Sequence, residues 1–389
     1  MKKITEIINS LQISETMFSN AEEKYISVAK FLMEKIGGAN VYTQGSFAIG
    51  ATTRPYKDGK ELSYDIDLIL EVERNKLEQD GDELLKEVYN ILNENVLYKG
   101  KLELGEKSIT IKYADIDGIG FTLDVVPAVK ESIDVKEELI AVGGKEEYIN
   151  DAVAISSLDK TDKDGWYTAT PKGYIKWFEE INFPYKMHLF ENMQRDKYGK
   201  IVYNSIEEVP YYKIKTPVQE AVQFFKRVRD IYYSKRKQYD KRPISAIITT
   251  IVASVASRNS NYRLTVVDLI MDVIKELKTY NEYNFLTEEE FYVNYPNYVD
   301  IKKNNGKWEM INPTNPKDNL VDSWNSDKSI SKLFFEWLDI IDEEVAKIIA
   351  NPKDIILYEN LFGTEVVSKL LGNEIKENIL EGPKPYGEC

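Results

Sequence analysis

The segment from Tyr42 to Glu71 constrains the fold more than any other part of the chain. Residues 65–70 read D-I-D-L-I-L, so a strand here carries Asp65 and Asp67 on one face and an isoleucine and two leucines on the other. The apolar face requires a core on one side of a sheet. Two carboxylates two residues apart repel each other unless a cation lies between them. The segment therefore predicts a half-buried strand whose start suits a divalent metal with oxygen ligands.

A glycine–serine turn precedes this strand. Val41 begins a short predicted strand that leads through Gln44 into Gly45 and Ser46. Glycine lets the backbone approach a ligand closely, and a serine hydroxyl with N–H groups at a helix start can hold phosphate oxygens. A D-x-D pair alone could mark an exposed strand start, and a Gly-Ser pair an ordinary turn. Their combination across one intervening loop is more specific and indicates metal-assisted phosphoryl or nucleotidyl transfer.

A third carboxylate is available on another predicted strand. Lys107 to Tyr113 and Ile119 to Val126 alternate as two strands of a hairpin, and Asp124 falls on the face opposite the apolar residues. Because V-V-P follows directly, we expect Asp124 to lie at a buried strand end rather than on a solvated edge. The spacing of Asp115 and Asp117 repeats the D-x-D pattern, but Asp117-Gly118 is typical of the hairpin turn itself.

A basic pair marks a later helix. Thr216 and Gln219 form a predicted capping box with a proline between them, so a helix begins here. Lys226 and Arg229 lie three residues apart on this helix and share one face. Charged residues on helices most often face solvent, so the positions of this pair do not by themselves indicate a function.

Composition limits the classes of protein to be considered. The 389 residues suffice for one large or two intimate domains, and the one cysteine, Cys389, excludes an internal disulfide. The first residues show no signal-peptide pattern, and the most apolar run, 244–256, is too short to span a bilayer. These features favour a cytoplasmic protein without a membrane partner. With a net charge of −14 we expect no nucleic acid template or activator, because a duplex needs many phosphate contacts.

Taken together, the motifs resemble the bacterial cGAS/DncV-like nucleotidyltransferases (CD-NTases) of the polymerase-β-like superfamily, which are relatives of cyclic GMP-AMP synthase and 2′-5′ oligoadenylate synthetase. The similar segments are Q-G-S-F-A-I-G-A-T-T-R-P, Y-D-I-D-L-I-L, F-T-L-D-V-V-P-A, T-P-V-Q-E-A-V-Q-F-F-K-R-V-R-D and R-P-I-S-A-I-I-T-T. They sample the chain up to about Ser257. Beyond that point the chain matches only as a helical region.

The resemblance implies an α+β fold with two lobes. We expect a polymerase-β-like catalytic lobe with a mixed sheet and an N-terminal helix in residues 1–165. Residues 166–380 would form a mostly helical lobe that resembles the C-terminal domain of oligoadenylate synthetase. Residues 381–389, rich in Pro and Gly, would be a flexible tail.

The resemblance also implies an activity and a site. Such enzymes join NTPs, without a template and with release of pyrophosphate, into a cyclic di- or trinucleotide second messenger for anti-phage defence. Two Mg²⁺ ions, or Mn²⁺, would be held by Asp65, Asp67 and Asp124. In the animal synthase a lysine and a serine on the equivalent helices hold the donor triphosphate, and Lys226 and Ser245 match them in type and order. The full set of expected nucleotide-binding residues is Gln44, Gly45, Ser46, Lys226, Arg229 and Ser245.

The sequence motifs leave alternative activities open. The enzyme could make linear oligonucleotides, or it could transfer nucleotides to RNA, a protein or a small molecule. A non-catalytic nucleotide sensor is also conceivable, although the complete acid triad argues against it. Some relatives have their C-terminal carboxylate conjugated to a target by a ubiquitin-ligase-like partner, and residues 386–389 loosely fit that pattern. The bases used, the ring size and the 2′ or 3′ linkage are not encoded in these motifs.

Overall fold

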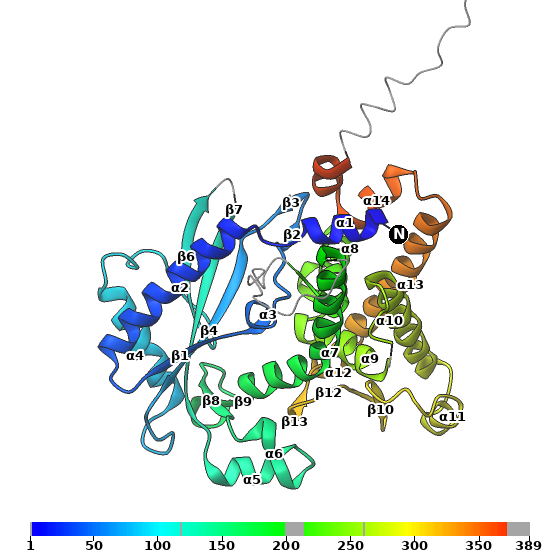
Figure 1. Cartoon of the computed structure of the whole chain (residues 1–389). Coiled ribbons are helices and arrows are strands. Elements are labelled where there is room, and N and C mark those ends of the chain that lie inside the picture. Colours follow the sequence, from blue (N-terminus) through cyan, green and yellow to red (C-terminus); the bar gives the residue numbers. More distant parts are fainter. Residues whose placement is uncertain (1, 117–118, 199–213, 260, 372–389) are drawn as a thin grey trace, which may run out of the picture.

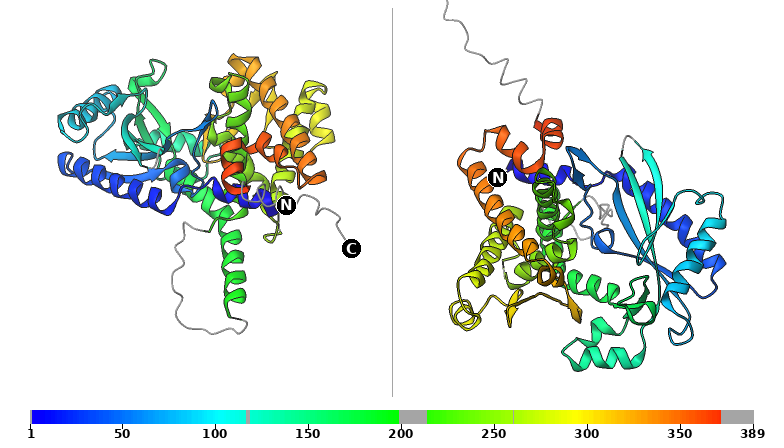
Figure 2. Two further views of the ribbon diagram at one scale, coloured as in Figure 1. Left: turned by 90° about the horizontal axis from the view of Figure 1, so that it is seen from above. Right: turned by 180° about the vertical axis from the view of Figure 1, so that it is seen from behind.

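The computed structural model describes residues 2–116, 119–198, 214–259 and 261–371, and it consists of two lobes side by side (Figure 1). One lobe is built on a β-sheet and the other is mostly helical. Figure 2 shows the same division from above and from behind, with the second half of helix α7 projecting away from both lobes. The predicted pairing of an α+β lobe with a helical lobe is confirmed. Within the described ranges, no helix combines the length and the apolar character needed to cross a bilayer.

A seven-stranded mixed sheet forms the first lobe. Its central strands β4 and β7 pair in parallel, and all the other neighbours are antiparallel. The strand order is β1-β4-β7-β6-β5, and β8 and β9 extend the sheet from β7. The strands are β1 (Asn40–Gln44), β4 (Tyr64–Val72), β5 (Leu102–Leu104), β6 (Ile109–Ile116), β7 (Ile119–Lys130), β8 (Val153–Ser156) and β9 (Trp166–Ala169).

One face of this sheet is covered by two helices, α2 (Glu15–Lys35) and α4 (Gly81–Glu94). The predicted alternation is confirmed, because Ile66, Leu68 and Leu70 are all fully buried in the core that these helices close. On β7, Phe121, Leu123 and Val125 are buried in the same core. The residues between them therefore point to the opposite face, which is where the three predicted acids lie.

The helical lobe has its own, larger core. Its longest helices are α7 (Pro171–Tyr198), α8 (Pro217–Lys235), α9 (Ser245–Arg258), α10 (Val266–Tyr280) and α13 (Lys328–Ala350). Helix α8 begins as predicted, with the Thr216 side chain and Gln219 forming both bonds of a capping box. Nearly every residue of α8 is buried, because other elements pack around it on most sides.

The remaining elements are shorter helices, 3₁₀ turns and short strands. They are α1 (Lys2–Ser10), α3 (Gly45–Ala48), α5 (Ile133–Ala141), α6 (Glu146–Ile149), α11 (Glu288–Asn294), α12 (Asp322–Ser326), α14 (Ile355–Phe362), 3₁₀ turns at 163–165, 239–241 and 281–284, and β2 (Tyr56–Lys57), β3 (Lys60–Glu61), β10 (Lys302–Asn304), β11 (Lys307–Glu309), β12 (Ile311–Asn312) and β13 (Asn315–Asn319).

Three features differ from the expected organisation. The expected N-terminal helix is two helices, α1 and α2, because Ser14 caps a new helix at Glu15. Helix α1 packs in the core of the helical lobe although it lies within residues 1–165. Strand β9 continues the sheet past residue 165. The division at 165 thus stays a prediction, and the tail at 381–389 lies outside the described residues.

Candidate active site

Strand register brings two of the three predicted acids together. Asp67 on β4 is the direct neighbour of Asp124 on β7, and Gln44 on β1 is its neighbour on the other side. Asp65 lies two residues earlier on the same face of β4, roughly 6–7 Å along the strand. The Lys226 ammonium of helix α8 acts electrostatically on Asp67, so this face of the sheet looks toward the helical lobe. The fold therefore gathers the acids opposite the predicted phosphate-binding lysine.

Asp67 is the central acid of the group. Its burial raises its pKa to about 7, helped by the charges of Asp124 and Asp65, whereas Lys226 lowers the pKa. Its carboxylate Oδ2 lies 2.5 Å from the position that a Cβ atom would take at Gly45, and Gly45 has a φ of +62°. Only glycine combines that backbone conformation with such a close approach. The Gly-Ser turn is thus packed directly against the central acid.

The two outer acids are each bound by a threonine hydroxyl. Thr110 Oγ1 donates to Asp124 Oδ1 at 2.5 Å, and Thr122 Oγ1 donates to Asp65 Oδ1 at 2.6 Å. In both pairs the threonine is the direct cross-strand neighbour of the acid. Burial raises the pKa of Asp124, and the Thr110 hydroxyl opposes that shift by stabilising the ionised form.

The acids form an open ligand set rather than a closed cage. Among the residues that the structure describes, no three His, Cys, Asp or Glu side chains converge as a ready-made metal cage. Mg²⁺ in nucleotide-handling sites is commonly bound through one or two carboxylates plus substrate phosphates. The repulsion that helps to raise the pKa of Asp67 is the interaction that a divalent cation would relieve. Asp65, Asp67 and Asp124 therefore fit divalent cations whose other ligands come from a substrate.

A polar stripe of helix α8 binds the backbone that follows the Gly-Ser turn. Its residues are spaced by three or four positions, so they share one face of the helix. Two amides and an ammonium donate to loop carbonyls, and a carboxylate and a hydroxyl accept from backbone N–H groups. The pairs are Gln219 Nε2 with Ile49 O (2.8 Å), Gln223 Nε2 with Thr52 O (2.9 Å), Lys226 Nζ with Ala51 O (3.3 Å), Asp230 Oδ2 with Tyr56 N (3.2 Å) and Ser234 Oγ with Asp58 N (2.7 Å). We refer to residues 49–58 as the strap.

Lys226 is a buried cation whose charge acts on Asp67. It is only 8% exposed, and this burial lowers its pKa to about 8, as does the nearby Arg229. The charges of Asp65 and Asp67 act in the opposite direction. Since Lys226 influences the two acids and is influenced by them, the structure brings these predicted residues together.

Arg229 and Ser245 are hydrogen-bonded to each other, and Arg229 lies near Lys226 on the same helix. The Arg229 guanidinium is bound to Asp230 Oδ1, to the Pro243 carbonyl at 3.0 Å and to Ser245 Oγ at 3.2 Å. Ser245 is the first residue of α9, so this contact ties the start of α9 to α8. Ser46 lies in α3, and its hydroxyl bonds to no described residue. Nucleotide contacts of Arg229, Ser245 and Ser46 stay predictions.

Sequence reasoning missed the strap and the threonines. The signal for the strap was a polar stripe at helical spacing, Gln219, Gln223, Lys226, Asp230 and Ser234, inside an otherwise buried helix. Alternation places Thr122 on the same face of β7 as Asp124, but its partner Asp65 is set by the register between β4 and β7. The partner of Thr110 is likewise set by register, between β6 and β7.

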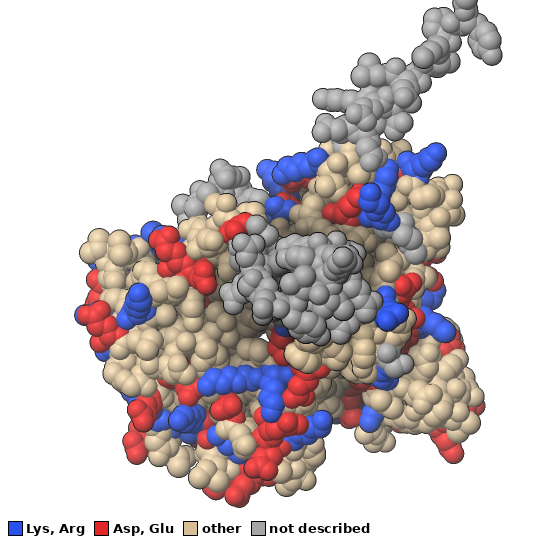
Figure 3. Space-filling view, in the orientation of Figure 1, with Lys and Arg blue, Asp and Glu red and all other residues tan. Residues whose placement is uncertain are grey.

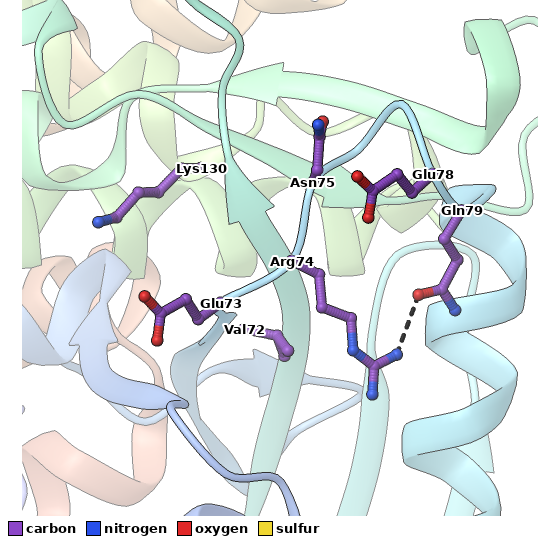
Figure 4. Close-up of a pocket in the computed structure, with 7 residues that line it drawn as sticks. All are labelled: Val72, Glu73, Arg74, Asn75, Glu78, Gln79 and Lys130. Carbon is purple, nitrogen blue, oxygen red and sulfur yellow. Dashed lines mark hydrogen bonds between the residues drawn. The ribbon is translucent and has the colours of Figure 1, made fainter.

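A cavity at the far end of β4 is unrelated to these acids. It has a volume of about 560 Å³ and is lined by residues 72–75, 78, 79 and 130 (Figure 4). Arg74 in its wall donates to Gln79 at 2.9 Å and is paired with Glu87. Since β4 carries its acids at the opposite end, the cavity lies roughly 15–20 Å from them.

On the surface in Figure 3, basic and acidic side chains are interspersed.

Comparison with known proteins gives relatives along almost the whole chain, although no family model matches. The c-di-GMP synthase of Roseivirga ehrenbergii is 26% identical over 377 residues, which are 95% of this chain and 85% of that protein. The structure is similar to the CD-NTase CdnG of Bradyrhizobium diazoefficiens, solved in complex with GTP, with a TM-score of 0.65 and 17% identity over 96% of this chain and 98% of CdnG. It is also similar to the Vibrio cholerae DncV cyclic AMP-GMP synthase, a prokaryotic cGAS homolog.

The DncV alignment has a TM-score of 0.53 and 15% identity and covers 95% of this chain and 87% of DncV. Both solved structures therefore share the two-lobed fold described above, and the Roseivirga protein adds a relationship in sequence over the same length. In sequence and in fold, this chain is thus similar to the bacterial cGAS/DncV-like proteins, the CD-NTases.

Proposed function

We propose that this chain is a CD-NTase, a metal-dependent nucleotidyltransferase that joins NTPs, without a template, into a cyclic di- or trinucleotide second messenger and releases pyrophosphate. The observation that carries the proposal is the placement of Asp65, Asp67 and Asp124 on one sheet face opposite the buried Lys226. The relative named c-di-GMP synthase supports cyclisation as the outcome. A role in anti-phage defence is part of the proposal and rests on the family resemblance.

Each group has a role in the transfer. The three acids would hold two Mg²⁺ ions, with Mn²⁺ as a substitute, and the ions would supply charge neutralisation at the α-phosphate and a lower pKa for the acceptor hydroxyl. The acceptor ribose oxygen forms a bond to the α-phosphorus, the bond to the pyrophosphate oxygen breaks, and the hydroxyl proton leaves to solvent. Lys226 would bind triphosphate oxygens, with Gly45 and Ser46 holding the phosphates from the sheet side.

Guanine nucleotides are the first substrates to test. The Roseivirga relative is named for a product made of guanine nucleotides, and CdnG was solved with GTP. We propose GTP as one substrate, in a protein that needs no nucleic acid template or activator. Conjugation of the C-terminal carboxylate by a ubiquitin-ligase-like partner is a further proposal, and residues 386–389 on which it rests lie outside the described residues.

The test is synthesis by the purified protein with labelled NTPs, singly and in pairs, in Mg²⁺ or Mn²⁺. Product that survives phosphatase and has the mass of a cyclic oligonucleotide is the expected result. Phosphatase-sensitive oligomers would instead indicate a linear product, and turnover only with an added second substrate would indicate a transferase. Asp67→Asn should abolish synthesis, whereas Asp115→Asn, the same change on β6, which β7 separates from β4, should leave it intact. No product under any condition would refute the proposal.

A further inference from the structure

The hydrogen bonds of the two outer acids differ from those of other carboxylates in the same sheet. Glu131 is a useful comparison, because Thr168 Oγ1 donates to its Oε2 at 2.8 Å just as a threonine does for each outer acid. Glu131 is also paired with Lys76 and accepts from the backbone N–H of Ser132. Its carboxylate is fully buried, with partners for both oxygens. The Thr168 bond therefore completes a closed structural network.

Asp65 and Asp124 are left open by comparison. Within the described part of the chain neither acid forms an ion pair, and a threonine hydroxyl is the one hydrogen-bond donor to each side chain. In both acids the hydroxyl binds Oδ1, so Oδ2 remains without a protein donor. Asp67 is directly opposite Asp124 and two residues after Asp65, and no described hydroxyl donates to it. The arrangement fixes two carboxylates and leaves one oxygen of each available.

Threonine is well suited to hold a carboxylate in one orientation. Its branched Cβ restricts the χ1 angle, so the hydroxyl takes a defined position on the face of the sheet. Thr110 lies beside Asp124 across the antiparallel β6–β7 pair, and Thr122 lies beside Asp65 across the parallel β4–β7 pair. In metal sites, groups that hydrogen-bond to ligating carboxylates orient them and tune metal affinity.

We propose that Thr110 and Thr122 are positioning residues that hold the Oδ1 atoms of Asp124 and Asp65 and thereby present the Oδ2 atoms to the catalytic cations. This inference rests on the proposed function, because it assigns the threonines a purpose only if the acids bind metal. It predicts that loss of either hydroxyl weakens metal binding more than it weakens the fold or nucleotide binding.

The experiment measures Mn²⁺ binding to the full-length protein by electron paramagnetic resonance, with a GTP analogue whose α–β bridging oxygen is replaced by methylene. Thr110→Val and Thr122→Val keep the branched shape and remove the hydroxyl. Each should weaken Mn²⁺ binding about tenfold or more, the usual range for such outer groups. Thr110→Ser and Thr122→Ser should restore most of the affinity. The KM for GTP should change little, and the Mg²⁺ concentration needed for half-maximal turnover should rise in parallel.

Thr168→Val is the matched control, because it removes the same kind of threonine–carboxylate bond from the same sheet. It should lower the melting temperature without altering Mn²⁺ affinity. If a valine variant does not fold, the alanine and serine variants at that position differ by the hydroxyl alone and give the same comparison. Valine variants that bind Mn²⁺ like the wild type, or serine variants as weak as valine, would overturn the positioning role. A wild-type protein that binds no Mn²⁺ would refute the proposed function as well.

Discussion

The ammonium group of Lys226 donates a hydrogen bond to the carbonyl oxygen of Ala51 at 3.3 Å, and so joins α8 to the strap that follows the Gly45–Ser46 turn. Among the described residues Lys226 forms no ion pair, although it lies close enough to Asp65 and Asp67 for their charges to raise its pKa. A neutral carbonyl is a weaker partner than a phosphate oxygen. The lysine is thus held beside the acids with its charge available to a triphosphate.

The first prediction concerns the alkaline side of the pH profile. Burial lowers the pKa of Lys226 to about 8, so the ammonium is charged below pH 8 and becomes neutral above it. If Lys226 binds the triphosphate through its charge, as proposed, kcat/KM, which reports the free enzyme, should fall above about pH 8. Rate measurements from pH 6 to 10 would show this decline. Lys226→Arg, which stays charged, should move the decline upward, and Lys226→Met should be poor at every pH. An unchanged alkaline limb in the arginine variant would contradict the assignment.

The acid side of the profile should depend on metal concentration. Asp67 has a pKa of about 7 in the absence of metal, so below that pH it takes up a proton and loses its negative charge. A cation and a proton compete for the same carboxylate. Raising Mg²⁺ should therefore shift the acid limb of kcat/KM to lower pH and leave the alkaline limb in place. Profiles at several Mg²⁺ concentrations test this, and an acid limb that ignores Mg²⁺ would show that another group titrates.

Gly45 and Gly59 provide a matched pair of substitutions. Both have positive φ angles, +62° and +85°, so alanine at either position costs roughly 1–2 kcal/mol of backbone strain. At Gly59 nothing lies within 4 Å of the added Cβ, whereas at Gly45 the Asp67 Oδ2 atom lies 2.5 Å away. We expect Gly45→Ala to abolish synthesis and Gly59→Ala to retain it at a similar melting temperature. Equal activity of the two variants would mean that the turn does not press on Asp67.

The strap should link stability to activity. Gln223→Met removes the donor to the Thr52 carbonyl and leaves a buried acceptor without a partner, which costs roughly 1–3 kcal/mol. Since the strap continues directly from the Gly-Ser turn, we also expect a higher KM for NTP. Gln12→Met is the control, because among the described residues that amide donates only to Asn9 Oδ1, on the exposed surface. Denaturant unfolding and steady-state kinetics measure both effects. A Gln223→Met protein with a lower stability but an unchanged KM would separate the strap from the site.

Several parts of the protein were predictable from sequence because they depend on short-range rules. Alternation along residues 65–70 and 119–126 fixed which side chains are buried, and so put Asp65, Asp67 and Asp124 on the polar face. The capping box at Thr216 gave the start of α8. The resemblance to CD-NTases followed from motifs on these elements.

Tertiary structure alone decided which of these elements meet. Gln219 was predictable as a helix cap, yet its amide also binds the Ile49 carbonyl, 170 residues away in the chain. The pairing of Thr110 with Asp124 depends on strand register, and the packing of α1 in the helical lobe depends on a break at Ser14. Such contacts have no local signature, because they depend on strand register and on how elements far apart in the chain pack together. The sequence by itself determined which strand face carries the acids, where the Gly-Ser turn lies and where helix α8 begins. The packing of the two lobes determined that these three parts lie together in one site.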